Sequence, residues 1–279
     1  MGINAAPHSI LFVIAVIVLS ALEYVWRVRS GRGYDLRALG GTVGTMVGQI
    51  LSKGLTNGVI AVAMLSIYAL APFQWAMDDW KTWIAGFFVL EFFYYWQHRF
   101  SHTVRWFWAS HAVHHSPNEL TLPAAMRLSW TSGISGLWVF FIPMTVLGFH
   151  PVLVATLQVI NLQYQYFLHT DAVGKLGPLE WIFNTPSHHR VHHGSNPEYL
   201  DKNFGGVLVI FDRLFGTFQA ELDDAPVVYG LTKPLHSNNP FVIVFHEWGN
   251  LIRDARKATS IRGVLQTLFG SPGDTPFSP

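Results

Sequence analysis

Three short segments of the chain each carry two or three histidines at the spacing of one helical face. Side chains three or four positions apart lie above one another on a helix, so each segment can present its imidazoles to a single point. One such pair would be weak evidence, but three in one chain predict a metal centre. A further histidine, His169, lies alone between the second and third segments. The segment histidines are His98 and His102 in HRFSH, His111, His114 and His115 in HAVHH, and His189, His192 and His193 in HRVHH.

The number of these imidazoles predicts two metal ions. Neutral imidazole binds zinc, copper, iron and nickel, and nine imidazoles are more than one ion accepts. A structural zinc site closes with four ligands, and a haem uses histidines on opposite sides of a porphyrin rather than helical triplets. The chain has no cysteine, which excludes thiolate ligands, disulfides and a cysteine nucleophile.

The composition is that of a membrane protein. Of the 279 residues, 50% are hydrophobic and 13% are charged, which leaves too little polar surface to cover a soluble domain of this size. The net charge is +1 and no basic run is present, so we exclude nucleic acid as a partner.

The apolar segments predict an all-α protein, a polytopic bundle of about four to five membrane spans with a helical cap. Residues 9–26 form the first expected span. Glycines and Lys53 interrupt residues 41–73, so we expect its later part, 55–73, to cross the membrane. A third span, 82–97, runs directly into the first histidine segment. We expect residues 1–80 to form N-terminal transmembrane helices and residues 81–279 to form a catalytic domain of membrane helices and cap.

Topology predicts that all nine histidines meet on one side of the membrane. Residues 132–149 and 151–168 predict a helical hairpin, whose ends return to the side that they left and bring His169 back to the first two segments. No further span follows residue 170, so the third segment lies on the same side. The positive-inside rule makes this side cytoplasmic, because the first span is followed by Arg27, Arg29, Arg32 and Arg37.

The order of the motifs resembles a known family. HRFSH, HAVHH, FLHT and NTPSHHRVHH together resemble the fatty acid hydroxylase and sterol desaturase superfamily of membrane di-iron enzymes. Residues 201–218, 227–235 and 239–248 are most similar to its alkylglycerol monooxygenase branch. The resemblance implies a multi-pass membrane protein with two iron ions at the cytoplasmic face. It also implies a membrane lipid as substrate, O2 as cosubstrate, and a redox protein or tetrahydropterin as external electron donor. The iron ligands that it implies are His98, His102, His111, His114, His115, His169, His189, His192 and His193.

Two classes of function fit the histidines. A lipid monooxygenase or desaturase would insert oxygen, cleave an ether or form a double bond, and ligand spacing does not choose among these outcomes. The alternative is a zinc transporter or sensor without oxidative chemistry. A transporter would spread its ligands along a path through the bilayer, whereas these histidines gather at one interface, which favours the enzyme.

Several polar residues could hold the ligand histidines in place through hydrogen bonds. Glu91 shares a helical face with His98 and His102, and we predict that it accepts a hydrogen bond from a ligand imidazole; pairing with Lys53 is the alternative. Gln165 lies one turn before His169, where some fatty acid hydroxylases carry a histidine, so it either leaves a coordination position open or orients a ligand. The other candidates are Asn161, His188, Asp201 and Asn203.

Overall fold

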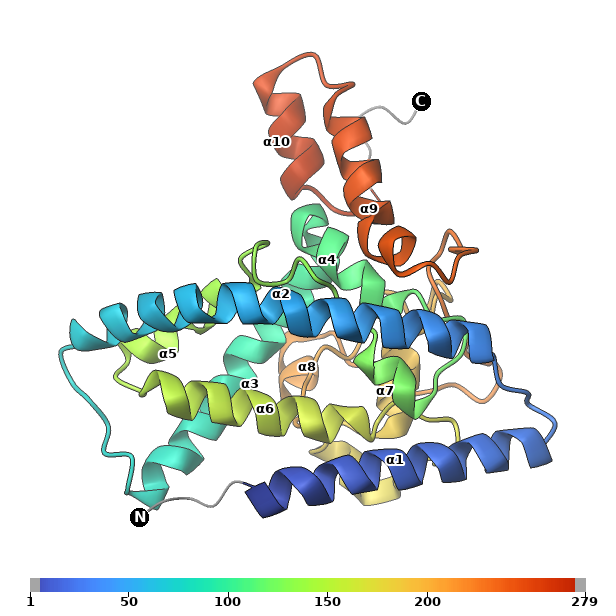
Figure 1. Ribbon diagram of the computed structural model, residues 1–279, viewed down its shortest axis with the longest axis horizontal. Helices are drawn as coiled ribbons and strands as arrows, with labels where there is room; N and C mark the ends of the chain where they lie inside the picture. The colour runs from blue at the N-terminus through green and yellow to red at the C-terminus, as the bar shows by residue number, and fades with distance from the viewer. Residues whose placement is uncertain (1–5, 274–279) are drawn as a thin grey trace.

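The computed structural model describes residues 6–273, and apart from two isolated β-bridges all regular structure in this part of the chain is helical (Figure 1). This confirms the predicted all-α class. Three long helices come first: α1 (Ala6–Arg29), α2 (Leu36–Ala69) and α3 (Trp80–Thr103). The shorter helices are α4 (Arg105–His115), η1 (Leu122–Met126), η2 (Leu137–Phe141), α5 (Ile142–Val146), α6 (Pro151–Tyr166), η3 (Gly177–Trp181), α7 (Pro186–His192), α8 (Ile210–Phe215), α9 (Pro240–Ala255) and α10 (Ile261–Phe269).

Two helices among the described residues are long and apolar enough to cross a membrane. They are Ile10–Arg29, with a mean hydropathy of 2.1, and Leu36–Ala69, with a mean hydropathy of 1.6. Only 11% and 6% of these apolar windows are buried within the protein. A core helix of a soluble protein would bury most of such a surface, so these two exposed apolar helices indicate a membrane protein. The expected number of four to five spans remains a prediction.

Helix α2 corrects the expected start of the second span. It runs without a break for 34 residues, starting well before residue 55, and the side chain of Asp35 caps it by accepting from two backbone N–H groups. Its early glycines allow close contact rather than interrupting the helix. A Cβ on Gly44 would lie 2.3 Å from the ring of Pro240, and one on Gly48 would lie 2.1 Å from the ring of Trp130.

This contact makes Gly48→Ala a destabilising change. The indole of Trp130 is held by a hydrogen bond of 2.8 Å to the carbonyl of Thr45, so it cannot turn away without losing that bond. We expect the free energy of unfolding in detergent to fall by about 1–3 kcal/mol. Gly54→Ala is the matched control, because no atom lies within 4 Å of its added Cβ. Equal effects of the two changes on thermal unfolding would contradict the close packing of α2.

The predicted hairpin is only half helical. Its second arm forms α6, but residues 132–149 form turns followed by the short helices η2 and α5. The physical reason lies in Gly136, whose φ of +86° belongs to the left-handed region, and in Pro143, which can only start a helix. The prediction of one helix over residues 132–149 was therefore wrong.

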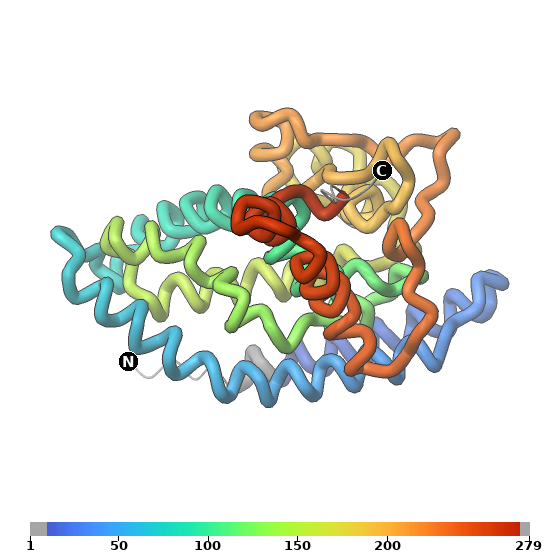
Figure 2. Tube along the Cα trace, turned by 90° about the horizontal axis from the view of Figure 1, so that it is seen from above, coloured from blue at the N-terminus to red at the C-terminus, as the bar shows by residue number. Residues whose placement is uncertain are grey.

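The remaining elements bring the histidine segments together. Helix α3 continues into α4 after Val104, and α3 also packs against α6 and η2 around buried Leu90 and Leu153. Helix α9 packs on α4 and on α2, and α10 packs on α4 and α9 (Figure 1). The segment between α8 and α9 lies at the same end of the molecule as the α1–α2 connection, opposite the α2–α3 connection (Figures 1 and 2).

Candidate metal centre

The nine predicted histidines lie in two groups, each with its ring nitrogens within 4.8 Å of one another. Each pair at i and i+4 stays in one group. The middle histidine of HAVHH, His114, lies in the group opposite to its neighbours, and so does the middle histidine of HRVHH, His192. Helix α4 and the α7 segment therefore each serve both groups. The rings of His115 and His193 stack across the boundary with centroids 4.4 Å apart. The five-histidine group is His98, His102, His111, His115 and His192, and the four-histidine group is His114, His169, His189 and His193.

The Nε2 atoms face one another at the distances of shared coordination. Nε2 of His111 lies 3.1 Å from Nε2 of both His98 and His115. In the four-histidine group the successive Nε2 separations are 3.0 to 3.2 Å. Zinc–nitrogen bonds are about 2.0–2.1 Å long, which places neighbouring nitrogens about 3 Å apart on one ion. The donor set therefore fits a metal in each group.

Backbone carbonyls fix the tautomers of three of these histidines. Nδ1 of His98 lies 2.8 Å from the carbonyl oxygen of Phe204, and Nδ1 of His192 lies 3.0 Å from that of Lys202. Nδ1 of His169 lies 2.8 Å from the carbonyl of Gln165. A carbonyl only accepts, so each Nδ1 carries the proton and each Nε2 turns its lone pair to the group. Nε2 of His192 is buried with no hydrogen-bond partner within residues 6–273, as expected of a metal ligand.

Burial keeps the histidines of both groups that lie on α4 and in the α7 segment neutral. Loss of hydration lowers the pKa of His114 to about 4. Burial, followed by the neighbouring imidazoles, lowers the pKa of His115 and His193 well below its usual value. The same causes act on His111, His189 and His192. Neutral imidazole is the form that binds a metal, so the site needs no proton release at pH 7.

The backbone of the 201–206 loop was missed as part of the site, although the side chains of Asp201 and Asn203 were predicted to orient ligand histidines. It supplies the carbonyls of Lys202 and Phe204 that orient two histidines. Buried Asp212 holds the loop, because its carboxylate accepts from the N–H groups of Phe204 at 2.7 Å and Gly205 at 2.8 Å. The signal in the sequence is DKNFGG, since Asp201 and Asn203 both adopt a φ of +55°, which Asp and Asn tolerate better than most residues.

Glu91 corrects a specific expectation. Its side chain is 1% exposed, but its partners are neither an imidazole nor Lys53. One oxygen accepts from the Asn161 amide at 2.5 Å, and the other accepts from the N–H groups of Val207 and Leu208 at 2.8 and 2.9 Å. A buried carboxylate needs several donors, and the loop backbone supplies more of them than one ring could. Glu91 thus ties α3 to the loop that orients His98.

Gln165 and Asn161 lie beside the histidines but outside both groups. The Gln165 amide donates to the side-chain oxygen of Asn161, and its own oxygen accepts from the hydroxyl of Tyr94 at 3.0 Å. Only the backbone carbonyl of Gln165 contacts a grouped histidine, His169. The orienting role fits this geometry, because that carbonyl faces Nδ1 of His169.

The last three candidates differ in what they touch. Asp201 has a carboxylate oxygen 3.7 Å from Nδ1 of His102, so it lies beside a grouped histidine. His188 turns away from both groups, with its ring against Phe218 and 3.9 Å from the Glu180 carboxylate. Asn203 donates to the backbone carbonyl of His188 at 3.0 Å and contacts no imidazole within the described chain.

Two long, exposed apolar helices and two groups of buried, neutral histidines define this protein as a membrane protein with a candidate metal site. Residues 83–217, which include all nine histidines, match the model described as fatty acid hydroxylase. Residues 83–217 thus carry the fatty acid hydroxylase domain that the motifs predicted.

Relatives with established names support this assignment. The alkylglycerol monooxygenase of Danio rerio is 42% identical over 238 residues, which cover 82% of this chain and 52% of the relative. The alkylglycerol monooxygenase of Homo sapiens is 40% identical over 76% of this chain and 46% of its own length. An ornithine lipid hydroxylase of Rhizobium tropici is 30% identical over 72% of this chain and 61% of its own length. The chain thus spans about half the length of the alkylglycerol monooxygenases that it matches. No solved structure matches it significantly.

Proposed function

We propose that the protein is an O2-dependent di-iron oxidoreductase that acts on a C–H bond of a membrane lipid. The observation that carries this proposal is the pair of interleaved, buried histidine groups, of five and four members. The matched relatives are named as a monooxygenase and a hydroxylase of lipids, which favours oxidative chemistry over a zinc transporter or sensor. In this proposal residues 81–279 carry the reaction and residues 1–80 anchor the chain, with the site on the cytoplasmic side.

The nine histidines would hold two iron ions, one in each group. Bound iron would supply the activation of dioxygen that C–H oxidation requires, with electrons from a redox protein or a tetrahydropterin. The chain itself holds the imidazoles in one tautomer through the carbonyls of Lys202, Phe204 and Gln165. Its Glu91 and Asp212 fix the loop that carries two of those carbonyls. Burial of the groups keeps bulk water away from the reacting carbon.

Three products are consistent with this site. Oxygen insertion gives an alcohol, and removal of two hydrogens gives a double bond. Hydroxylation of the carbon next to an ether oxygen gives a hemiacetal, which collapses to an aldehyde and a free alcohol. The names of the relatives favour oxygen insertion, with ether cleavage as its consequence on an ether lipid.

Mass spectrometry of extracted lipids tests the proposal. Cells that make the protein under 18O2 are compared with cells that make His192→Ala at the same level. We expect one lipid class to gain a labelled oxygen or to lose its ether chain as a labelled aldehyde. Unchanged lipids, together with a purified protein that holds zinc and moves zinc into liposomes, would contradict the proposal and support the transporter.

A further inference from the structure

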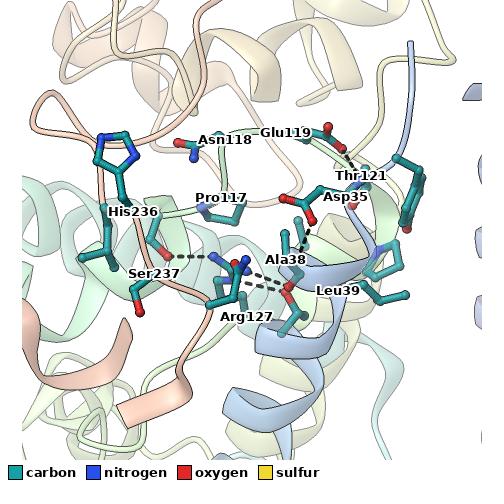
Figure 3. A pocket seen from close by; sticks show the side chains of 17 residues that line it. Asp35, Ala38, Leu39, Pro117, Asn118, Glu119, Thr121, Arg127, His236 and Ser237 are labelled. Atoms are coloured by element: carbon teal, nitrogen blue, oxygen red, sulfur yellow. Dashed lines mark hydrogen bonds between the residues drawn. The ribbon is translucent and has the colours of Figure 1, made fainter. Parts of the chain in front are cut away.

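A polar cavity of about 230 Å³ lies beside the candidate metal centre (Figure 3). Its walls come from the start of α2, from residues 116–127 and from residues 235–238. Ser116, which lines the cavity, directly follows His115 of the five-histidine group. The cavity also lies where α1 ends and α2 begins. With these two helices as the membrane anchor of the proposed function, this is the level of lipid headgroups.

Arg127 places a buried positive charge in this cavity. The residue is 3% exposed, and its guanidinium donates to Thr42 at 3.1 Å, Ser116 at 3.2 Å and the Ala38 carbonyl at 2.8 Å. These three acceptors are neutral, and two of its five N–H donors are left over. Within residues 6–273 no carboxylate forms an ion pair with it, although Asp35 is near enough to affect its pKa. Buried charges are normally paired with an opposite charge. An anion bound in the cavity would supply that partner for the Arg127 guanidinium.

The rim of the cavity carries the opposite charge. Figure 3 shows Asp35 and Glu119 on one side of the cavity and His236 on the other, with Arg127 below. Glu119 is already paired with Arg27 at 3.2 Å. Asp35 is exposed and accepts only from backbone N–H groups of the α2 start, at 2.8 and 3.0 Å. The cavity thus offers a positive floor and a negative rim.

We propose that this cavity binds the zwitterionic headgroup of the lipid substrate, with its phosphate or carboxylate on Arg127 and its ammonium group beside Asp35. This inference rests on the proposed function. Arg recognises oxyanions through paired N–H donors. The volume is below the roughly 300–1,000 Å³ of common ligand pockets, so the cavity holds a headgroup while the chains stay in the membrane. Because Ser116 follows His115, the carbons next to the headgroup, rather than the chain end, lie beside the histidines.

Binding measurements on the full-length, iron-loaded protein in detergent, kept anaerobic, test the inference without turnover. The probes are a single-chain ether lipid with a phosphoethanolamine headgroup and an uncharged alkylglycerol of equal chain length. Free phosphoethanolamine and inorganic phosphate are the soluble competitors. We expect the zwitterionic lipid to bind at least about 10-fold more tightly than the uncharged one. Arg127→Gln should abolish this preference, and Arg127→Lys should keep part of it. Asp35→Asn, which retains the helix cap, should weaken binding of the zwitterionic lipid alone.

Exposed Arg37 on the same helix provides the control, because Arg37→Gln removes a positive charge outside the cavity. Equal binding of the two lipids to the unchanged protein would overturn the inference. So would an intact preference in folded Arg127→Gln, or competition by inorganic phosphate as strong as that by free phosphoethanolamine. The two proposals fail separately: lipid oxidation without headgroup preference overturns only this one, and headgroup preference without oxidation overturns only the proposed function.

Discussion

Alanine at His192 or at His189 is expected to abolish lipid oxidation and to lower the iron content from two ions per chain to one or none. His192 belongs to the five-histidine group and His189 to the four-histidine group, so each change disrupts a different ion. Loss of a residue that merely supports a metal ligand costs about 10- to 100-fold in affinity or activity, and loss of a ligand should cost at least about 100-fold. Elemental analysis of the purified protein and product formation from the lipid measure the two effects.

His246→Ala is the control for these two changes. His246 lies on α9, half-buried, with its Nδ1 2.8 Å from the Ile243 carbonyl, and it belongs to neither group. It should keep both ions and full activity. Two ions and undiminished turnover in His189→Ala or His192→Ala would refute the assignment of that residue.

Glu91→Ala is expected to destabilise the protein and to loosen the iron of the five-histidine group. The change leaves the Asn161 amide and the N–H groups of Val207 and Leu208 without their acceptor in a buried place. A buried donor without a partner costs about 1–3 kcal/mol, and three donors that relax together should cost about 3–5 kcal/mol, the loss seen when a buried charged group's partner is removed. Thermal unfolding in detergent and iron content per chain measure the result.

The stability and iron content of Glu91→Gln should lie between those of Glu91→Ala and the unchanged protein. The single amide oxygen of glutamine can still accept from part of the donors that contact Glu91. Glu198→Gln is the control, since the side chain of Glu198 is exposed. If Glu91→Ala unfolds at the temperature of the unchanged protein and keeps both ions, the carboxylate does not hold the loop in place.

The spacing of the histidines predicted which of them share a helical face, because helical periodicity alone decides this, whereas their convergence was predicted from the order of the apolar segments. The positions of α1 and α3 followed equally from continuous apolar runs. The sequence did not predict that His114 and His192 would cross to the opposite group, since that depends on how α4 and α7 are turned toward each other. Nor did it predict that Val207 and Leu208 donate to Glu91 or that Phe204 orients His98, because these contacts are made by backbone groups, which are alike at every position. The helical length of residues 132–149, the first arm of the hairpin, was overestimated because hydropathy does not reveal the left-handed turn at Gly136.

The crossing of histidines between the groups has a consequence for how the protein acquires its metals. Helix α4 and the α7 segment each contribute histidines to both groups. An ion bound by one group would therefore align both backbones and place the histidines of the other group for binding. We therefore expect positive cooperativity in iron uptake, in which partly loaded molecules are scarce and the ions enter and leave as a pair.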